Sequence, residues 1–309
     1  MNTKITVINE TTLKLTENFK NSQMLINDNG KHMPSRKAII DLLKQIRRVV
    51  FPGYFNDEVV LSDTPEYYVG NMLANVYKSL KEQVTLALMY ENSKNEAKEI
   101  IEKRADCICS GFFGQLPNIQ KLLLKDVQAA FNGDPAANSM EEIIFSYPGL
   151  FAIYVYRIAR ILYQCNVPFI PRIMTEYAHG KTGIDINSGA EIGEYFFIDH
   201  GTGIVIGETC VIGNNVKIYQ GVTLGALSTR SGQLLKGVKR HPTICDNVTI
   251  YSGATVLGGE TVIGENVIIG GNCFITESIA PCTKVSAKPP ELIIKNPKPA
   301  NNKNNCWEI

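Results

Sequence analysis

The chain has 309 residues and a formal net charge of +1 at pH 7, because 31 lysines and arginines nearly balance 30 aspartates and glutamates. At about 150 residues per domain, this length allows roughly two domains. The balanced charge and the lack of a basic block argue against a nucleic-acid-binding protein. No apolar run approaches the ~18 residues of a membrane span. We therefore expect no nucleic-acid partner and no membrane association.

The cysteines and the first residues indicate a reducing compartment. The eight cysteines are scattered, and Cys107 and Cys109 are too close together for a usual zinc knuckle. The first residues lack the apolar core of an export signal. We therefore expect reduced thiols, a cytoplasmic location and no bound metal.

The first half of the chain is predicted to be helical after a polar extension. Residues 1–33 are weakly patterned, so we interpret them as an N-terminal extension in the form of a loose strand or an arm. Apolar residues at helical spacing and proline or glycine at the ends predict helices at 34–50, 65–91, 95–109, 117–131, 140–145 and 148–165. Gly111 and Gly114 predict a break between the third and fourth of these. Residues 34–180 are thus expected to form a helical domain.

The second half repeats a six-residue pattern. An aliphatic residue leads each unit, glycine often follows, and a small or β-branched residue comes four positions after the lead. The leads are Ile186, Ile192, Ile198, Ile206, Ile212, Ile218, Ile244, Ile250, Leu257, Ile263, Ile269 and Ile275. The phase slips by two residues near Ile204 and by one before Leu257, and a stretch from Leu224 to Pro242 interrupts the repeat.

This period predicts a parallel β-helix over residues 181–288. Six residues suit a short strand plus a tight turn, and stacked units bury the aliphatic side chains that one unit cannot bury alone. A β-sandwich would alternate with period two and would not keep an aliphatic residue at every sixth position. The fold class is therefore α+β, a helical domain followed by a β-helix of hexapeptide repeats. Residues 289–309 are rich in proline, lysine and asparagine and are expected to form a flexible C-terminal tail.

Charged residues and two of the four histidines stand out in the repeat. His200 follows Asp199, and His241 follows Arg240 at the end of the interrupting stretch. A coil takes about three units, or ~18 residues, so Asp185 can lie near His200 on a neighbouring coil. A carboxylate that orients a histidine and stabilises its protonated form is typical of a general base. A solvated corner is the alternative, but the convergence of these residues favours a site.

Several segments of the chain resemble bacterial serine O-acetyltransferases of the hexapeptide-repeat acetyltransferase family. They are Asp-Pro-Ala at 134–136, Tyr-Arg-Ile-Ala at 156–159, Gly-Ile-Asp-Ile at 183–186, Ile-Asp-His-Gly-Thr-Gly-Ile-Val-Ile-Gly-Glu-Thr at 198–209, Gly-Val-Thr-Leu-Gly at 221–225 and Arg-His-Pro at 240–242. The likeness covers roughly residues 65–288, and the segments 198–209 and 240–242 are its most specific parts. It implies a left-handed parallel β-helix and transfer of acetyl from acetyl-CoA to the hydroxyl of L-serine, the first step of cysteine biosynthesis.

The resemblance also implies residue roles. It makes His200 the general base, with Asp185 as the carboxylate behind it. As a separate hypothesis on the mechanism, we expect His241 or a backbone N–H to be a further catalytic group that donates to the oxyanion. The residues implied to hold the amino acid are Asp134, Asp199, Arg240 and His241, and Glu208 is a further candidate for substrate binding. Those implied beside CoA are Gly225, Ala226, Ala254 and Gly270.

The partners implied by the resemblance are small molecules and other protein chains. L-cysteine is expected as a feedback inhibitor that competes with L-serine. A homotrimer or a dimer of trimers is expected, with active sites between subunits, and the terminal Ile309 is expected to enter cysteine synthase. This chain departs from many relatives at Asn187-Ser188, where they have His-Pro, and its loop 226–239 is longer.

Three other functions share the β-helix. A hexapeptide acetyltransferase acting on a sugar or antibiotic hydroxyl would share the fold and the base but not the Asp134 segment. A γ-type carbonic anhydrase would need a third histidine for its zinc. A non-catalytic scaffold would have no need of the clustered Asp185, His200, Arg240 and His241.

Overall fold

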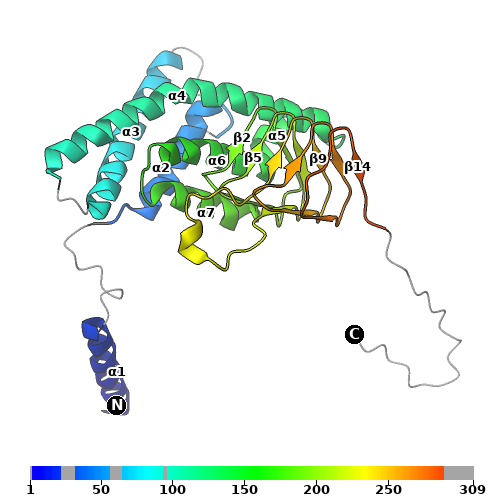
Figure 1. Cartoon of the computed structure of the whole chain (residues 1–309). Coiled ribbons are helices and arrows are strands. Elements are labelled where there is room, and N and C mark those ends of the chain that lie inside the picture. The colour runs from blue at the N-terminus through cyan, green and yellow to red at the C-terminus, as the bar shows by residue number, and fades with distance from the viewer. Residues whose placement is uncertain (1, 22–31, 56–64, 93–95, 289–309) are drawn as a thin grey trace, which may run out of the picture.

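The computed structural model describes residues 2–21, 32–55, 65–92 and 96–288. Figure 1 shows helices first along the chain and strands after them. The described helices are α1 (Asn2–Asn21), α2 (Arg36–Val50), α3 (Pro65–Glu91), α4 (Lys98–Gly133), α5 (Met140–Ser146), α6 (Pro148–Gln164) and α7 (Ile170–Thr182). The helices predicted at 34–50, 65–91, 140–145 and 148–165 are confirmed as α2, α3, α5 and α6, and α7 was not predicted.

Residues 98–133 form one continuous helix, so the predicted break at Gly111 and Gly114 is wrong. Pro117 lies inside α4 and does not start a new helix. Glycine costs about 1 kcal/mol and proline about 3 kcal/mol inside a helix. The helix nevertheless continues because its apolar side is buried along the length, as at Phe112 and Leu123. Tertiary packing of that side outweighs the local propensities.

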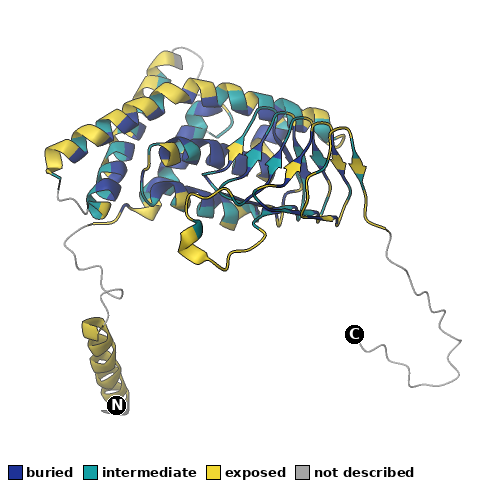
Figure 2. Cartoon of the chain, viewed as in Figure 1, coloured by how far each residue is buried: buried dark blue, intermediate teal, exposed yellow. Residues whose placement is uncertain are grey.

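Residues 2–21 are helical, which corrects the expected loose strand or arm. Side chains from Lys4 to Asn21 are exposed, as Figure 2 shows. Thr12 donates to the carbonyl oxygen of Ile8 at 2.8 Å, and Thr16 donates to that of Thr12 at 2.7 Å. Threonine hydroxyls can bond to the preceding turn in this way. The large apolar side chains of this helix, among them Ile8, Leu15 and Phe19, are exposed, so no packing within the described chain accounts for it.

The predicted boundaries between the four parts of the chain stay predictions. The last helix ends at Thr182 and the first strand begins at Asp185. The predicted tail, 289–309, lies outside the described residues. None of the described helices is long and apolar enough to cross a membrane.

After α7 the chain coils into a left-handed parallel β-helix, which confirms the predicted fold class. Its strands are β1 (Asp185–Ile186), β2 (Glu191–Ile192), β3 (Phe197–Asp199), β4 (Val205–Ile206), β5 (Val211–Ile212), β6 (Lys217–Tyr219), β7 (Thr223–Gly225), β8 (Thr243–Ile244), β9 (Thr249–Ile250), β10 (Thr255–Leu257), β11 (Val262–Ile263), β12 (Ile268–Ile269), β13 (Phe274–Ile275) and β14 (Lys284–Val285). Sheet A contains β1, β4, β7, β10 and β13, sheet B contains β2, β5, β8 and β11, and sheet C contains β3, β6, β9, β12 and β14. Each coil passes through the three sheets in turn, so it takes three units, as predicted.

The aliphatic residues of the repeat fill the inside of the coil. One inward column of sheet A runs through strands in parallel register and is buried throughout; it contains Ile186, Ile206, Leu224, Val256 and Ile275. Val256, and not the predicted lead Leu257, occupies the inward position. The one-residue slip therefore falls after β10, at Gly258, whose φ is +111°. Leu224, which falls in the stretch expected to interrupt the repeat, also lies inward, so the six-residue period assigned Ile186, Ile206 and Ile275 of this column correctly.

A buried ion pair joins the helical half to the coil. Arg157 of α6 donates to both carboxylate oxygens of Asp126 in α4, at 2.6 and 2.8 Å, and both side chains are almost fully buried. Asp126 also accepts the backbone N–H of Phe196 at 3.0 Å, and Arg157 donates to the carbonyl oxygen of Gly193 at 2.8 Å. These bonds fix α4 and α6 against the first coil.

Candidate active site

The two-residue slip near Ile204 and the long interruption lie on the two sides of sheet A, one before a strand of this sheet and one after a strand of this sheet. Residues 200–204 connect β3 to β4, where sheet C passes to sheet A. Residues 226–242 connect β7 to β8, where sheet A passes to sheet B, and this loop, with the 3-10 turn η1 (Gly232–Leu235), protrudes from the coil in Figure 1. His200 lies in the first break, and Arg240 and His241 lie in the second. The predicted catalytic histidines are therefore on different edges of the β-helix.

The first edge gathers Asp134, Tyr147, Asp199 and His200, termed here the His200 cluster. Asp134 caps the end of α4, and Asp199 ends β3. His200 has a positive φ of 57°, and its Nδ1 lies 3.7 Å from Asp199 Oδ1. Its side chain is 71% exposed, whereas that of Asp199 is 13% exposed. The imidazole is thus open to solvent and has a carboxylate beside it.

Two hydrogen bonds fix the carboxylate of Asp134. Its Oδ2 accepts from the Tyr147 hydroxyl at 2.6 Å, and its Oδ1 accepts from the backbone N–H of Ala136 at 2.8 Å. These bonds, with the nearby charge of His200, hold the pKa of Asp134 below its ordinary value. The bond to Asp134 in turn raises the pKa of Tyr147 to about 12. Asp134 is therefore a fixed negative charge near His200, which suits a cationic ligand.

Asp185 lies on the same edge as His200 but is not bonded to its ring. It opens β1, and its backbone N–H donates to the carbonyl oxygen of Ile204 at 2.9 Å. Within the described part of the chain, the charged partner of His200 is Asp199. A pairing of the Asp185 and His200 side chains stays a prediction.

The second edge gathers Tyr163, Glu208, Thr209, Arg240 and His241, termed here the Arg240 cluster. Arg240 Nη2 donates to Glu208 Oε2 at 2.5 Å, and the Tyr163 hydroxyl donates to Glu208 Oε1 at 3.0 Å. Burial alone would raise the pKa of Glu208. The two hydrogen bonds outweigh burial and hold that pKa below its ordinary value. The ionised carboxylate of Glu208 thus holds the Arg240 guanidinium in place.

His241 is buried beside Arg240 with one ring nitrogen engaged. Its Nδ1 accepts the backbone N–H of Thr209 at 3.1 Å and lies 2.8 Å from the Thr209 hydroxyl. That hydroxyl accepts the backbone N–H groups of Arg240 and His241, so its own hydrogen is left for Nδ1. Burial, and then the charge of Arg240, lower the pKa of His241 to about 4. Near pH 7 the ring is therefore neutral and offers Nε2–H as a donor.

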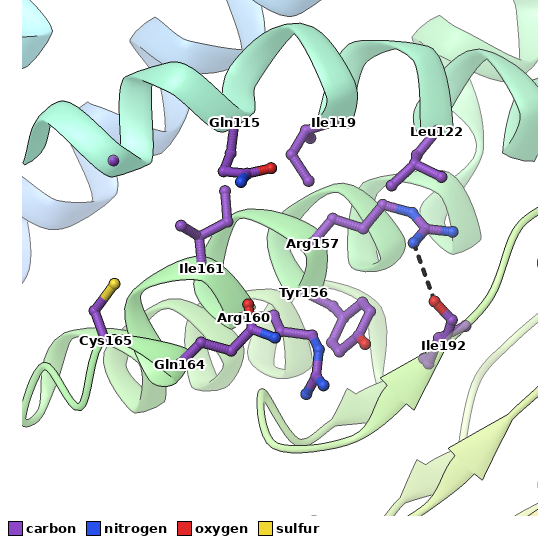
Figure 3. A pocket seen from close by; sticks show the side chains of 11 residues that line it. Gln115, Ile119, Leu122, Tyr156, Arg157, Arg160, Ile161, Gln164, Cys165 and Ile192 are labelled. Carbon is purple, nitrogen blue, oxygen red and sulfur yellow. Dashed lines mark hydrogen bonds between the residues drawn. The ribbon is translucent and has the colours of Figure 1, made fainter. Parts of the chain in front are cut away.

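Two cavities of the described chain differ in their relation to these clusters. One of ≈ 450 Å³ lies beside the Arg240 cluster, and Tyr163, Glu208 and Thr209 are in its lining. Another of ≈ 360 Å³ lies between α4 and α6, and none of the predicted site residues is in its lining, as Figure 3 shows. The first cavity therefore borders the Arg240 cluster on the side of Glu208 and Thr209, whereas Arg240 and His241 are not in its lining.

The four residues expected beside CoA lie at different places. Gly225 ends β7 and Ala226 follows it, at the edge of the Arg240 cluster. Gly270 follows β12, at the edge between sheets C and A that also carries His200. Ala254 is 0% exposed inside the coil. Its place beside CoA stays a prediction.

Three residues of the two clusters were not predicted. Tyr147, Tyr163 and Thr209 bond to partners that are 13, 45 and 32 residues away in sequence. The repeat predicts where the corners of the coil lie, but not which residue of the helices packs over a corner. Nothing in the sequence pattern therefore marked the two tyrosines as site residues. Thr209 did have one, because it ends the specific segment 198–209. Among the described residues, no group of three or more His, Cys, Asp or Glu side chains is placed to hold a metal ion.

Comparison with known proteins gives consistent likenesses. No protein-family model matches the chain. It is 45% identical over 235 residues, 74% of each chain, to the plasmid serine acetyltransferase of Synechococcus elongatus. Its structure is similar to that of Entamoeba histolytica serine acetyltransferase 1 in complex with L-cysteine, with a TM-score of 0.71 and 38% identity over 79% of this chain and 86% of that one. The Neisseria gonorrhoeae serine acetyltransferase in complex with serine is similar with a TM-score of 0.53 and 26% identity, over 81% of this chain and 96% of that one.

Proposed function

Because this chain belongs to the serine acetyltransferase family, we propose that it transfers the acetyl group of acetyl-CoA to the hydroxyl of L-serine. The products are O-acetyl-L-serine and CoA, and the reaction is the first step of cysteine biosynthesis. The Neisseria gonorrhoeae relative binds serine, which supports serine as the acceptor.

The observation that carries the proposal is the pair of opposite charges on the two edges. The His200 cluster offers the fixed carboxylate of Asp134, with Asp199 nearby. The Arg240 cluster offers a guanidinium held by Glu208. A free amino acid carries an ammonium and a carboxylate and matches both charges, whereas a neutral sugar hydroxyl acceptor matches neither.

Arg240 keeps donors for the substrate carboxylate. Its Nη1 donates to the carbonyl oxygens of Leu235 and Val238, at 3.2 and 3.5 Å, and its Nη2 donates once to Glu208. A guanidinium has five N–H donors. The described partners therefore leave the Nε–H and one Nη2–H of Arg240 for the carboxylate of serine.

His200 is proposed as the base that removes the proton of the serine hydroxyl while its oxygen attacks the thioester carbonyl. A positioned base typically contributes ~10²–10⁴ in rate. Asp199, and Asp185 on the same edge, would offset the positive charge that the ring takes up. When the tetrahedral intermediate breaks its C–S bond, the protonated His200 returns the proton to the sulfur of CoA.

His241 is proposed to stabilise the oxyanion of that intermediate. Its neutral ring offers the Nε2–H, and donors already aimed at the developing charge are the most effective ones. Gly225 and Ala226 lie on the same edge and are proposed to border the acetyl-CoA thioester. Gly270 would border CoA from the other edge.

We propose that the two clusters meet between neighbouring chains of an oligomer. Since they lie on the two sides of sheet A, one chain presents His200 on one side and Arg240 on the other. A homotrimer, or a dimer of trimers, would place the His200 cluster of one subunit against the Arg240 cluster of its neighbour and close the ring.

Regulation and partners follow from the proposed substrate. L-cysteine differs from L-serine by one atom, and the Entamoeba histolytica relative binds L-cysteine, so we propose feedback inhibition by L-cysteine in competition with serine. The terminal Ile309, outside the described residues, is proposed to bind cysteine synthase, and deletion of Ile309 should then abolish co-elution. A cytoplasmic location is proposed because the reaction consumes acetyl-CoA.

The test is thiol release from acetyl-CoA with L-serine as acceptor, on the wild type and on His200→Ala. Serine-dependent release that falls by ~10²-fold or more in the variant supports the reaction and the base. Acetyl-CoA binding by calorimetry should stay unchanged in the variant. No release with serine from the wild type, but release with a sugar in an acceptor panel, would show that another hydroxyl is the acceptor.

A further inference from the structure

Each end of helix α6 carries a tyrosine that donates to a carboxylate of a different cluster. Tyr147 immediately precedes α6 and donates to Asp134 at 2.6 Å. Tyr163, in the last turn, donates to Glu208 at 3.0 Å. A helix of this length spans about 25 Å. A single element of the helical half therefore reaches both edges that carry the candidate site.

Between these ends α6 is bonded to the coil. The Tyr156 hydroxyl donates to the carbonyl oxygen of Ala190 at 2.7 Å. Arg157 donates to the carbonyl oxygen of Gly193 at 2.8 Å, and Figure 3 shows it reaching from α6 to that of Ile192. Because the middle of the helix is fixed to the first coil, the positions of both terminal tyrosines are fixed relative to the corners beneath them.

We propose that Tyr147 and Tyr163 are positioning residues for acetyl transfer. Tyr147 orients the Asp134 carboxylate toward the ammonium of serine. Tyr163 orients Glu208, which in turn holds the Arg240 guanidinium for the carboxylate of serine. This inference rests on the proposed function and gives the helical half a part in substrate recognition.

At the His200 cluster, the bonds from Tyr147 and Ala136 fix the orientation of the Asp134 carboxylate and leave acceptor capacity for a ligand. Tyr147 donates to Oδ2 and Ala136 to Oδ1, so each oxygen keeps lone pairs for a further donor. A phenol donor also stabilises the ionised carboxylate. Both effects favour recognition of an ammonium group.

At the Arg240 cluster, the backbone makes room for the contact of Tyr163 with Glu208. A Cβ at Gly189 would lie 2.7 Å from Glu208 Cγ and 2.9 Å from the Tyr163 hydroxyl oxygen. Glycine at this corner therefore lets the side chain of α6 approach a residue of the next coil. Glu208 in turn accepts from Arg240 at 2.5 Å, so Tyr163 is linked through Glu208 to the guanidinium that is proposed to bind the carboxylate of serine.

The experiment compares Tyr147→Phe and Tyr163→Phe with a matched control, Tyr154→Phe. Tyr154 lies on the same helix and is fully buried, but its hydroxyl donates to the backbone oxygen of Leu43 at 2.6 Å. Loss of a hydrogen bond to a charged group predicts a rise of about tenfold in the KM for serine in the two test variants. The KM for acetyl-CoA should stay within about twofold, and Tyr154→Phe should lower the melting temperature without raising the serine KM.

Two further readouts separate positioning from a purely structural role. Tyr147→Phe added to Asp134→Asn, and Tyr163→Phe added to Glu208→Gln, should raise the serine KM no further than the carboxylate variants alone. In carboxyl-¹³C NMR, Tyr147→Phe should raise the pKa of Asp134, because the bond that lowers it is gone.

The outcomes distinguish this inference from the proposed function. If the wild type acetylates serine and both tyrosine variants keep the wild-type serine KM, the positioning roles are wrong and the function stands. If the wild type does not use serine, the proposed function is wrong. The NMR titration then tests whether Tyr147 acts on the Asp134 carboxylate. An Asp134 pKa that is unchanged in Tyr147→Phe then overturns the inference.

Discussion

His241 Nδ1 lies 3.1 Å from the backbone nitrogen of Thr209 and 2.8 Å from its hydroxyl oxygen, so one residue supplies both donors to that ring nitrogen. A nitrogen that accepts two hydrogen bonds has no place for a proton of its own, so the ring carries its hydrogen on Nε2. His200, in contrast, is 71% exposed and bonded to no such donor within the described residues. This difference supports the two proposed roles, proton exchange for His200 and hydrogen-bond donation for His241.

We predict that the His241 imidazole is a neutral Nε2–H tautomer between pH 5 and 8. The pKa of about 4 leaves it unprotonated over this range. With only four histidines in the chain, ¹⁵N NMR of histidine-labelled protein can resolve it, with His241→Asn for assignment. A protonated Nδ1 at pH 7 would contradict the donor role.

The same group should make the fold sensitive to acid. The pKa of His241 is about 4 when folded and ordinarily 6.5, so between these values the unfolded chain binds a proton more readily. Stability is therefore lost as pH falls from about 6.5 to about 4, and rises with pH across the same range. Denaturant titrations should show a shallower pH dependence there for His241→Asn than for the wild type. Equal slopes would mean that His241 titrates alike in both states.

Gly207→Ala should damage activity through His241. A Cβ at Gly207 would lie 2.0 Å from His241 Cδ2 and 2.2 Å from its Nε2, so the ring must move. A displacement of about 1 Å at a reacting group costs on the order of 10²-fold in turnover. The matched control is Gly180→Ala in α7, where no atom lies within 4 Å of the added Cβ. That control should keep full activity and gain up to ~1 kcal/mol of stability; wild-type kcat in Gly207→Ala would contradict the placement of the ring.

Removal of Arg157 should destabilise the whole fold. It would leave the Asp126 carboxylate, which is 0% exposed, without its partner. Breaking a buried pair from one side costs about 3–5 kcal/mol, measurable by denaturant unfolding of Arg157→Met. The exposed pair of Lys98 and Glu102, 3.6 Å apart, is the comparison, because Lys98→Ala should cost no more than ~0.5 kcal/mol. A loss below 1 kcal/mol in Arg157→Met would show that Asp126 finds another partner or stays neutral.

The coil could be predicted from sequence because its rule is local and repeated. Every unit must place one aliphatic residue inward. The spacing of residues such as Ile186, Ile206 and Ile275 is therefore enough to predict a three-sided coil. The uninterrupted α4 could not be predicted the same way. Gly111 and Pro117 weaken a helix locally, and the burial that restores it depends on partners distant in sequence.

The site residues that interrupt the repeat of the β-helix could be predicted from the sequence, whereas the tyrosines contributed by the helical half could not. His200 and Arg240 interrupt an aliphatic pattern and are conspicuous for that reason. Tyr163 is one aromatic residue among many on an apolar helix, and only the packing of α6 on the coil brings it to Glu208.

The division of the site between two edges leads to the most direct measurement, subunit complementation between His200→Ala and Arg240→Ala. Each variant alone should be nearly inactive. In a closed ring of three with random mixing of equal amounts, about a quarter of the sites join an intact His200 cluster to an intact Arg240 cluster. Co-refolded variants should then recover about a quarter of the activity of wild type taken through the same procedure. A mixture as inactive as either variant alone would contradict a site shared between neighbouring chains.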